Sequence, residues 1–220
     1  MNRNTITLLS AAFTLATLSA CQPQEKAESE QPATVTATSA VSPSVNNTGS
    51  FHGSDIRQEN IGGDFTMTDG NGKPFNIGDL KGKIVLLSFG YTHCPDVCPT
   101  ELLTYNDVLT QLGDQAKDVA VVFASVDPER DTPELVGKYV QQFHPDFIGL
   151  TTTGDQNLAV IKQQYRIVSA KTEQQSDTVY LVDHTAGAYL LDKNGEVVVF
   201  EPYGNTAQQL ADDIRLLLKS

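Results

Sequence analysis

Two cysteines, Cys94 and Cys98, are the residues of this sequence whose type and spacing most clearly point to chemistry. They stand in the stretch YTHCPDVCPTE with three residues between them, and the 220-residue chain has one further cysteine. Such a pair could brace the fold as a disulfide, exchange electrons with a substrate, or supply two thiolates to a metal ion. A small fold stapled by disulfides would carry more cysteines, which favours the two chemical uses.

A proline follows each cysteine, and the first proline predicts where a helix begins. Proline is favoured at the first helical position, so Pro95 places Cys94 at the N-cap. The free N–H groups and the dipole of the helix lower the pKa of a thiol there. Residues four apart on a helix have Cβ atoms about 5–6 Å apart, whereas a disulfide needs about 3.8 Å. With Cys94 just outside the helix, we expect the pair to switch between a disulfide and two thiolates.

The elements that position the pair follow from the hydrophobic pattern. Continuous apolar runs at 83–92 and 118–127 predict two buried central strands. Turn residues in DGNGK and in KNG predict hairpins, the second of which spans 188–200. Periodicity and capping residues predict helices at 99–113, from 131 to about 145, at 155–165 and at 206–219, with a further strand at 178–182.

Strands that alternate with helices in this way indicate an α/β fold. We predict a thioredoxin-like fold with a central sheet, flanking helices, an N-terminal β-hairpin extension and an inserted helix. The cysteines would lie where the first central strand passes into its helix.

A third ligand is needed for a metal site, because two thiolates alone would bind weakly. Thiolates are soft ligands that favour Cu(I) or zinc. His184 follows the strand TVYLV, at the loop that faces the cysteine turn in thioredoxin-like folds, where VDHT replaces the usual cis-proline. Asp183 is a possible hydrogen-bond partner of its ring. The residues predict a Cu(I) or Cu(II) site of Cys94, Cys98 and His184. Zinc stays possible, although a closed structural zinc site would need a fourth ligand.

The other histidines have simpler interpretations. His52 lies at the edge of the N-terminal segment, His93 is expected to shape the cysteine loop, and His144 to cap a helix end. The stretch DPERDTP, which includes Asp127 and Asp131, is interpreted as a strand end and a helix cap. Its functional alternative is a polar rim that meets a partner.

The N-terminal segment indicates export and anchoring. Its apolar stretch after Arg3 is too short for a membrane span and is typical of a signal peptide, predicted at 1–20. LSAC resembles the lipobox of bacterial lipoproteins and predicts a lipid on Cys21. Residues 21–50 lack aromatic side chains and are expected to form a disordered tether before a domain at 51–220. The net charge of −12 excludes nucleic acid as a partner and leaves the lipid as the membrane contact.

Three stretches carry a resemblance to a known family. FGYTHCPDVCPTEL, ASVDPERDTPELVGKYV and YLVDHT resemble the Sco (SenC) family of copper-binding, thioredoxin-like assembly factors for cytochrome c oxidase, from about Phe51 to the C-terminus. The resemblance implies copper bound by Cys94, Cys98 and His184. It also implies a cell-envelope protein facing the periplasm, with the lipid on Cys21 as its membrane anchor.

The function implied by the resemblance is that of a metallochaperone more than of an enzyme. It would deliver copper to the binuclear copper site of oxidase subunit II, or another cuproprotein, or prepare the cysteines of that site. Expected partners also include a copper-donating chaperone and a thioredoxin-like reductant. The alternative is a periplasmic thiol–disulfide oxidoreductase or redox sensor that uses Cys94 and Cys98, in which His184 would hardly matter. Peroxide reduction is disfavoured by the CxxxC spacing.

Overall fold

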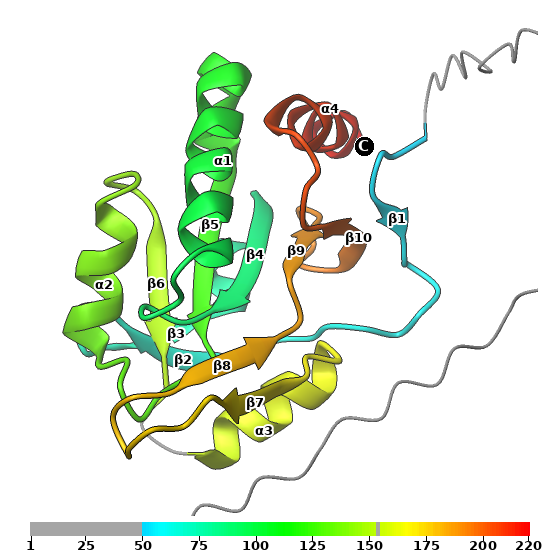
Figure 1. The fold of residues 1–220 in the computed structure, drawn as a ribbon. Coiled ribbons are helices and arrows are strands. Elements are labelled where there is room, and N and C mark those ends of the chain that lie inside the picture. The colour runs from blue at the N-terminus through cyan, green and yellow to red at the C-terminus, as the bar shows by residue number, and fades with distance from the viewer. Residues whose placement is uncertain (1–49, 153–154) are drawn as a thin grey trace, which may run out of the picture. The chain divides into compact units, whose positions relative to one another are not determined.

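The computed structural model describes residues 50–152 and 155–220. The chain divides into two units, Met1–Val45 and Asn46–Ser220. The predicted signal peptide, Cys21 and nearly all of the predicted tether lie outside the described residues. The elements of the second unit (Figure 1) are β1 Ser54–Asp55, β2 Thr66–Asp69, β3 Pro74–Asn76, a 3₁₀ turn Ile77–Leu80, β4 Ile84–Gly90, α1 Val97–Leu112, a 3₁₀ turn Gly113–Asp118, β5 Val119–Ser125, α2 Pro133–Gln141, β6 Ile148–Thr151, α3 Asp155–Gln164, β7 Ser169–Thr172, β8 Leu181–His184, β9 Gly187–Leu191, β10 Val197–Pro202 and α4 Ala207–Leu218.

An eight-stranded sheet with the order β1-β10-β9-β4-β5-β6-β2-β3 forms the centre of this unit. β4 and β5 lie in its middle as a parallel pair, with Ile84 opposite Val119 and Gly90 opposite Ser125. All residues of both strands are buried, as their continuous apolar runs predicted. β9 pairs antiparallel with β4 on the other side. The sheet therefore presents the end of β4 at its centre.

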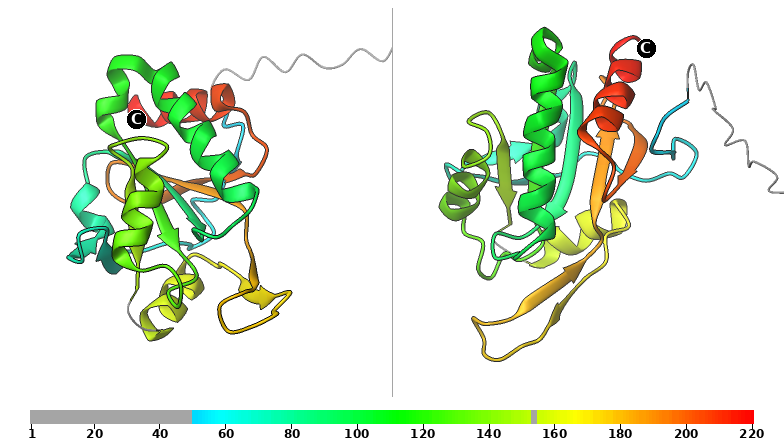
Figure 2. Two further views of the ribbon diagram at one scale, coloured as in Figure 1. Left: turned by 60° about the vertical axis from the view of Figure 1, so that its left-hand side comes forward. Right: turned by 45° about the horizontal axis from the view of Figure 1, so that its top comes forward.

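Helices α1, α2 and α4 lie on one face of the sheet, and α3 lies on the other (Figure 2). On the first face, the Phe123 ring of β5 packs 5.6 Å from the Tyr139 ring of α2. On the second face, Phe89 packs 5.5 Å from Tyr165, which follows α3. Gly90 lets α1 approach the strand end closely, because a Cβ there would lie only 2.7 Å from the Cys98 sulfur. The cysteine turn is thus built directly against the central strand.

Most of the predicted elements are present. The N-terminal hairpin is β2–β3, the C-terminal hairpin is β9–β10, and α4 begins after Thr206 with a capping box. The order β4, α1, β5, then β9, β10 and α4 is the thioredoxin-like arrangement that the sequence predicted, with α2 as the inserted helix. The short strands β1, β6 and β7 and the two 3₁₀ turns were not predicted, since elements of two to six residues carry little periodicity.

The predicted strand at 178–182 is displaced in the structure. The strand is Leu181–His184, and it pairs antiparallel with β7 in a separate two-stranded sheet beside α3 (Figures 1 and 2). The apolar pattern was misleading because Tyr180 is buried for another reason: its side chain packs against Arg130 and bonds to Asp127. As a result His184 ends the strand instead of lying in the loop after it.

Candidate metal centre

Cys94, Cys98 and His184 come together at the end of β4. One ligand atom from each lies within 4.8 Å of the other two. The Cys98 sulfur is 3.5 Å from Nε2 of His184. Bonds of about 2.0–2.3 Å to one ion would keep such atoms within roughly 4.6 Å of one another. The structure therefore brings the three predicted residues close to the spacing of a shared ion, and their role as ligands stays a prediction.

The helix after the cysteine turn begins between the two predicted starts, after Pro95 but before Pro99. It starts at Val97 with Asp96 as the N-cap, so the prediction of Cys94 as the N-cap was wrong. The reason is a turn in which the Cys94 N–H donates to the Tyr91 carbonyl at 3.2 Å. The Cys94 sulfur still reaches the helix, because the N–H of Cys98 donates to it at 3.4 Å. Cys94 thus accepts from a helix N–H that would otherwise lack a partner.

The two thiols differ in pKa. The pKa of the Cys94 thiol falls to about 3, chiefly because the Cys98 thiol donates a hydrogen bond to it, with further bonds from His184 and backbone N–H groups outweighing burial. The same bond and its own burial raise the pKa of Cys98 far above the ordinary value. At neutral pH one thiolate is already present, and a metal would have to displace the proton of Cys98.

The His184 ring is held in a defined orientation. Its Nδ1 lies 3.0 Å from the Thr185 carbonyl oxygen, which accepts a hydrogen bond from the Nδ1–H group, so that Nε2 faces the cysteines. The ring meets Tyr91 edge to face, with centroids 5.9 Å apart. Asp183 instead accepts from the Thr172 hydroxyl at 3.4 Å, so its predicted bond to His184 is replaced by Thr185. Burial lowers the pKa of His184, but bonds to the Cys94 thiolate and Thr185 raise it overall.

Glu101 is a buried residue of the site that the sequence interpretation missed. It lies on α1, is 6 % exposed, and its Oε1 accepts the N–H of Gly187 at 2.9 Å. Burial raises the pKa of its carboxyl to about 7, against the opposing effect of the Gly187 bond. The sequence signal that could have identified Glu101 was its position three residues after Cys98, on the apolar side of α1. The hydrogen bond of Glu101 connects the chain just after His184 to the helix that carries Cys98.

The remaining residues singled out from the sequence lie outside the cluster. His93 is exposed and bonds to the Thr92 hydroxyl, in line with its interpretation as a loop residue. His144 accepts the N–H of Asp146 in the turn after α2, whose C-cap is Gln142, so its side chain does not cap the helix as predicted. Thr132 caps α2. Asp127 and Asp131 are 3 % and 0 % exposed, so the alternative of a polar rim is wrong for these two.

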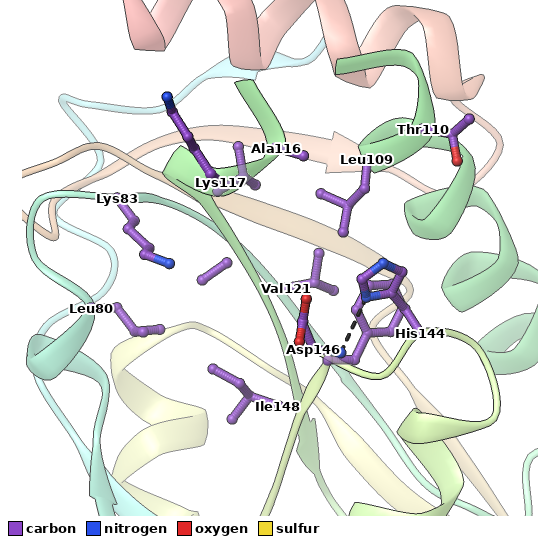
Figure 3. Close-up of a pocket in the computed structure, with 13 residues that line it drawn as sticks. Leu80, Lys83, Leu109, Thr110, Ala116, Lys117, Val121, His144, Asp146 and Ile148 are labelled. Carbon is purple, nitrogen blue, oxygen red and sulfur yellow. Dashed lines mark hydrogen bonds between the residues drawn. The ribbon is translucent and has the colours of Figure 1, made fainter. Parts of the chain in front are cut away.

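The candidate centre opens to the surface in a hollow of about 230 Å³ lined by Tyr91, Cys94 and His184 among others. A wider groove of about 600 Å³ lies at the opposite end of β4 and β5, where Figure 3 shows Lys83, Lys117 and His144 around apolar side chains. The groove shares no residue with the cysteine site.

The donor set fits a soft metal ion. Two sulfurs and one imidazole nitrogen suit Cu(I), Cu(II) or zinc, whereas hard ions such as Mg²⁺ prefer oxygen ligands. The fold and the site together define a thioredoxin-like protein whose paired cysteines and distant histidine form a candidate metal centre.

Comparison with known proteins then gives the family. The SCO1/SenC family profile matches residues 53–219, and the chain belongs to this family. It is 39 % identical over 137 residues to a SCO2-like protein of Rickettsia felis, covering 62 % of this chain and 66 % of that relative's length. Among solved structures, it is similar to copper-bound ScoI of Bradyrhizobium japonicum, with 41 % identity, a TM-score of 0.65, and coverage of 71 % of this chain and 99 % of that one.

A second solved structure bears on location. It is a SCO1/SenC family lipoprotein from Bacillus anthracis, 27 % identical with a TM-score of 0.62, covering 72 % of this chain and 95 % of that one. Within residues 50–152 and 155–220 of the present chain, no helix combines the length and apolar character that a membrane crossing needs.

Proposed function

We propose that this protein is a copper metallochaperone that binds one copper ion through Cys94, Cys98 and His184. Its family comprises copper-binding proteins involved in cytochrome c oxidase assembly. The observation that carries the proposal is the convergence of two thiol sulfurs and one imidazole nitrogen within 4.8 Å of one another. The recipient would be the binuclear copper site of oxidase subunit II, or another cuproprotein, whose cysteines this protein could also prepare.

The chemistry of the site suits a cargo that must be taken up and released. Cys94 offers a thiolate at neutral pH without prior loss of a proton, and it lines the surface hollow together with His184. Cys98 is 1 % exposed, so incoming thiols of a partner meet Cys94 before Cys98. Soft ligands can then be exchanged one at a time, a new bond forming as an old one breaks.

A copper titration tests this proposal. The reduced full-length protein is titrated with Cu(I) against a competing chelator, beside Cys94→Ser, Cys98→Ser and His184→Ala, with His144→Ala as the matched histidine control. We expect one copper per chain and, for each ligand variant, a loss greater than the roughly 10–100-fold typical of outer-shell partners. His144→Ala should bind as the wild type does. Equal binding by wild type and His184→Ala would refute the three-ligand site.

A thiol–disulfide oxidoreductase is the second candidate, and the opposite pKa shifts of the two thiols favour it. A reactive Cys94 thiolate beside a protonated Cys98 is the arrangement of an attacking and a resolving thiol. The discriminating measurement is the reduction potential of the pair with and without His184→Ala. A potential near those of redox proteins that is unchanged in the variant supports this function.

We further propose that the protein is a lipoprotein anchored through Cys21 and facing the periplasm. A copper-donating chaperone and a thioredoxin-like reductant would supply the ion and the reduced pair. The lipobox-like LSAC supports this anchor, as does the lipoprotein relative. Cys21→Ser should move the protein from the membrane fraction to the soluble fraction; retention in the membrane fraction would contradict the anchor.

A further inference from the structure

His184 is carried by an element outside the main sheet. Among the described strands, β8 pairs with β7 and with no strand of the eight-stranded sheet. Cys94, by contrast, lies in the turn between β4 and α1, and Cys98 lies in the first turn of α1. Strand pairing with the main sheet resumes only at β9, which begins at Gly187, and it holds the chain that follows His184. Before that point, contacts from the β7–β8 hairpin to the rest of the domain must hold β8 and His184 in place.

Arg130, in the loop after β5, makes the most extensive of these contacts. Its Nη1 donates to the Tyr180 carbonyl at 2.8 Å and to the Thr178 carbonyl at 3.5 Å. Its guanidinium carbon also lies 3.6 Å from the centroid of the Tyr180 ring. Both carbonyls belong to the segment that leads into β8. One side chain thus holds that segment through its backbone and through an aromatic face.

Asp127 closes the arrangement into a ring of contacts. One carboxylate oxygen accepts Nε of Arg130 at 2.6 Å, and the other accepts the Tyr180 hydroxyl at 2.8 Å. Asp127 and Tyr180 are each 3 % exposed, and the Arg130 side chain is 10 % exposed. A buried, hydrogen-bonded guanidinium cannot leave this position without stranding the carboxylate. The clamp of Asp127, Arg130 and Tyr180 is therefore rigid compared with a surface ion pair.

Tyr91 connects the clamp to the metal centre. The guanidinium carbon of Arg130 is 5.7 Å from the Tyr91 ring centroid, and the Tyr91 hydroxyl accepts the N–H of Val182 at 3.2 Å. The His184 ring meets the same Tyr91 ring edge to face. A shift of the segment at Tyr180 would be passed along β8 to His184, since Val182 and His184 belong to one short strand.

We propose that Arg130 is a positioning residue for the metal centre: with Asp127 and Tyr180 it fixes the β7–β8 hairpin so that Nε2 of His184 faces the cysteine pair. It contacts no proposed ligand itself. The inference rests on the proposed function as far as copper affinity is concerned, but the placement of His184 is a property of the copper-free protein.

The first test uses the copper-free, reduced protein. Asp127→Asn/Arg130→Met removes the clamp without leaving a buried unpaired charge, and Arg57→Met is the control, because Arg57 pairs with Asp55 at the surface. NMR would follow the His184 ring protons, which sense the ring current of Tyr91, and hydrogen exchange of the Val182 amide. We expect shifted His184 signals and faster Val182 exchange in the clamp variant alone. Unchanged signals and exchange in a folded clamp variant would overturn the proposal.

The second test is a double-mutant cycle on copper affinity. In the presence of His184, the clamp variant should bind Cu(I) about 10-fold more weakly than the wild type does. When His184→Ala is added to both proteins, the difference in their affinities should shrink to less than about twofold. An equal loss in both backgrounds would mean a general effect on the fold and would overturn the positioning role. If the wild type binds no copper, the proposed function fails, and the NMR comparison alone decides whether Arg130 positions His184.

Discussion

The Cys98 sulfur lies 3.5 Å from Nε2 of His184, a residue 86 positions further along the chain. The contact joins the helix after the central strand to a hairpin outside the main sheet. It places a protonated thiol, a thiolate and an imidazole in one hydrogen-bonded group, because Cys98 also donates to Cys94. The protonation of these three side chains can be followed through thiol reactivity and copper affinity as the pH changes.

The reactivity of Cys94 should hardly depend on pH. Its pKa of about 3, lowered chiefly by the Cys98 thiol, keeps it a thiolate throughout the range of pH 5 to 8. Alkylation of the reduced protein, followed by mass spectrometry of the Cys94 peptide, should therefore proceed at a nearly constant rate. In Cys98→Ala the largest cause of the lowered pKa is gone, so the rate at pH 5 should fall well below the rate at pH 8. A wild-type rate that climbs with pH as for a free thiol would contradict the assignment.

The contribution of His184 to copper affinity should shrink as the pH falls. Burial lowers its pKa, but its bonds to the Cys94 thiolate and to Thr185 raise it above the ordinary 6.5. Below that raised pKa the ring must first lose a proton from Nε2 before it can bind a metal. Proton loss by Cys98 affects both proteins and cancels in the ratio of the copper affinity of the wild type to that of His184→Ala. As the pH is lowered, this ratio should begin to fall while the pH is still above 6.5. A ratio constant from pH 5.5 to 8 would contradict this expectation.

Glu101 should make the copper-free domain less stable as the pH rises. Burial raises its folded pKa to about 7 from 4.5, so between these values the folded protein holds a proton that the unfolded chain has released. The free energy of unfolding of the wild type should fall by about 3 kcal/mol relative to Glu101→Gln between pH 4 and 8. Urea unfolding at both pH values measures this change. The exposed Glu134→Gln is the control, and a similar trend there would argue against burial as the cause.

Asp213 should hold the first residues of the domain onto α4. Its fully buried carboxylate accepts the backbone N–H groups of His52 and Gly53 at 2.8–2.9 Å. Asp213→Ala would leave those groups without their acceptor and should cost about 2–3 kcal/mol of unfolding free energy. Asp212→Ala, which removes a partly exposed ion pair with Arg215 and an exposed hydrogen bond from Gln208, should cost at most about 1 kcal/mol. Equal losses in urea unfolding would show that burial of Asp213 is unimportant.

Much of the fold could be predicted because its signals are local. Apolar runs in β4 and β5, the turn residues of the hairpins and the capping threonine before α4 act over a few residues, and the structure follows them. The alternation of these elements was enough for the thioredoxin-like arrangement. The strand at 178–182 was misplaced because Tyr180 is buried by a side-chain clamp, which no periodicity records.

The sequence by itself determined which side chains have the chemistry of the site: two cysteines with three residues between them and a histidine in VDHT at the facing position. Only the tertiary structure decided how they are held. The partner of His184 is Thr185 and not Asp183, Cys94 lies before the N-cap, and Glu101 is buried beside the site. The physical reason is that the direction of a side chain and its hydrogen-bond partner depend on backbone geometry. Here that geometry is set by contacts between segments far apart in the chain.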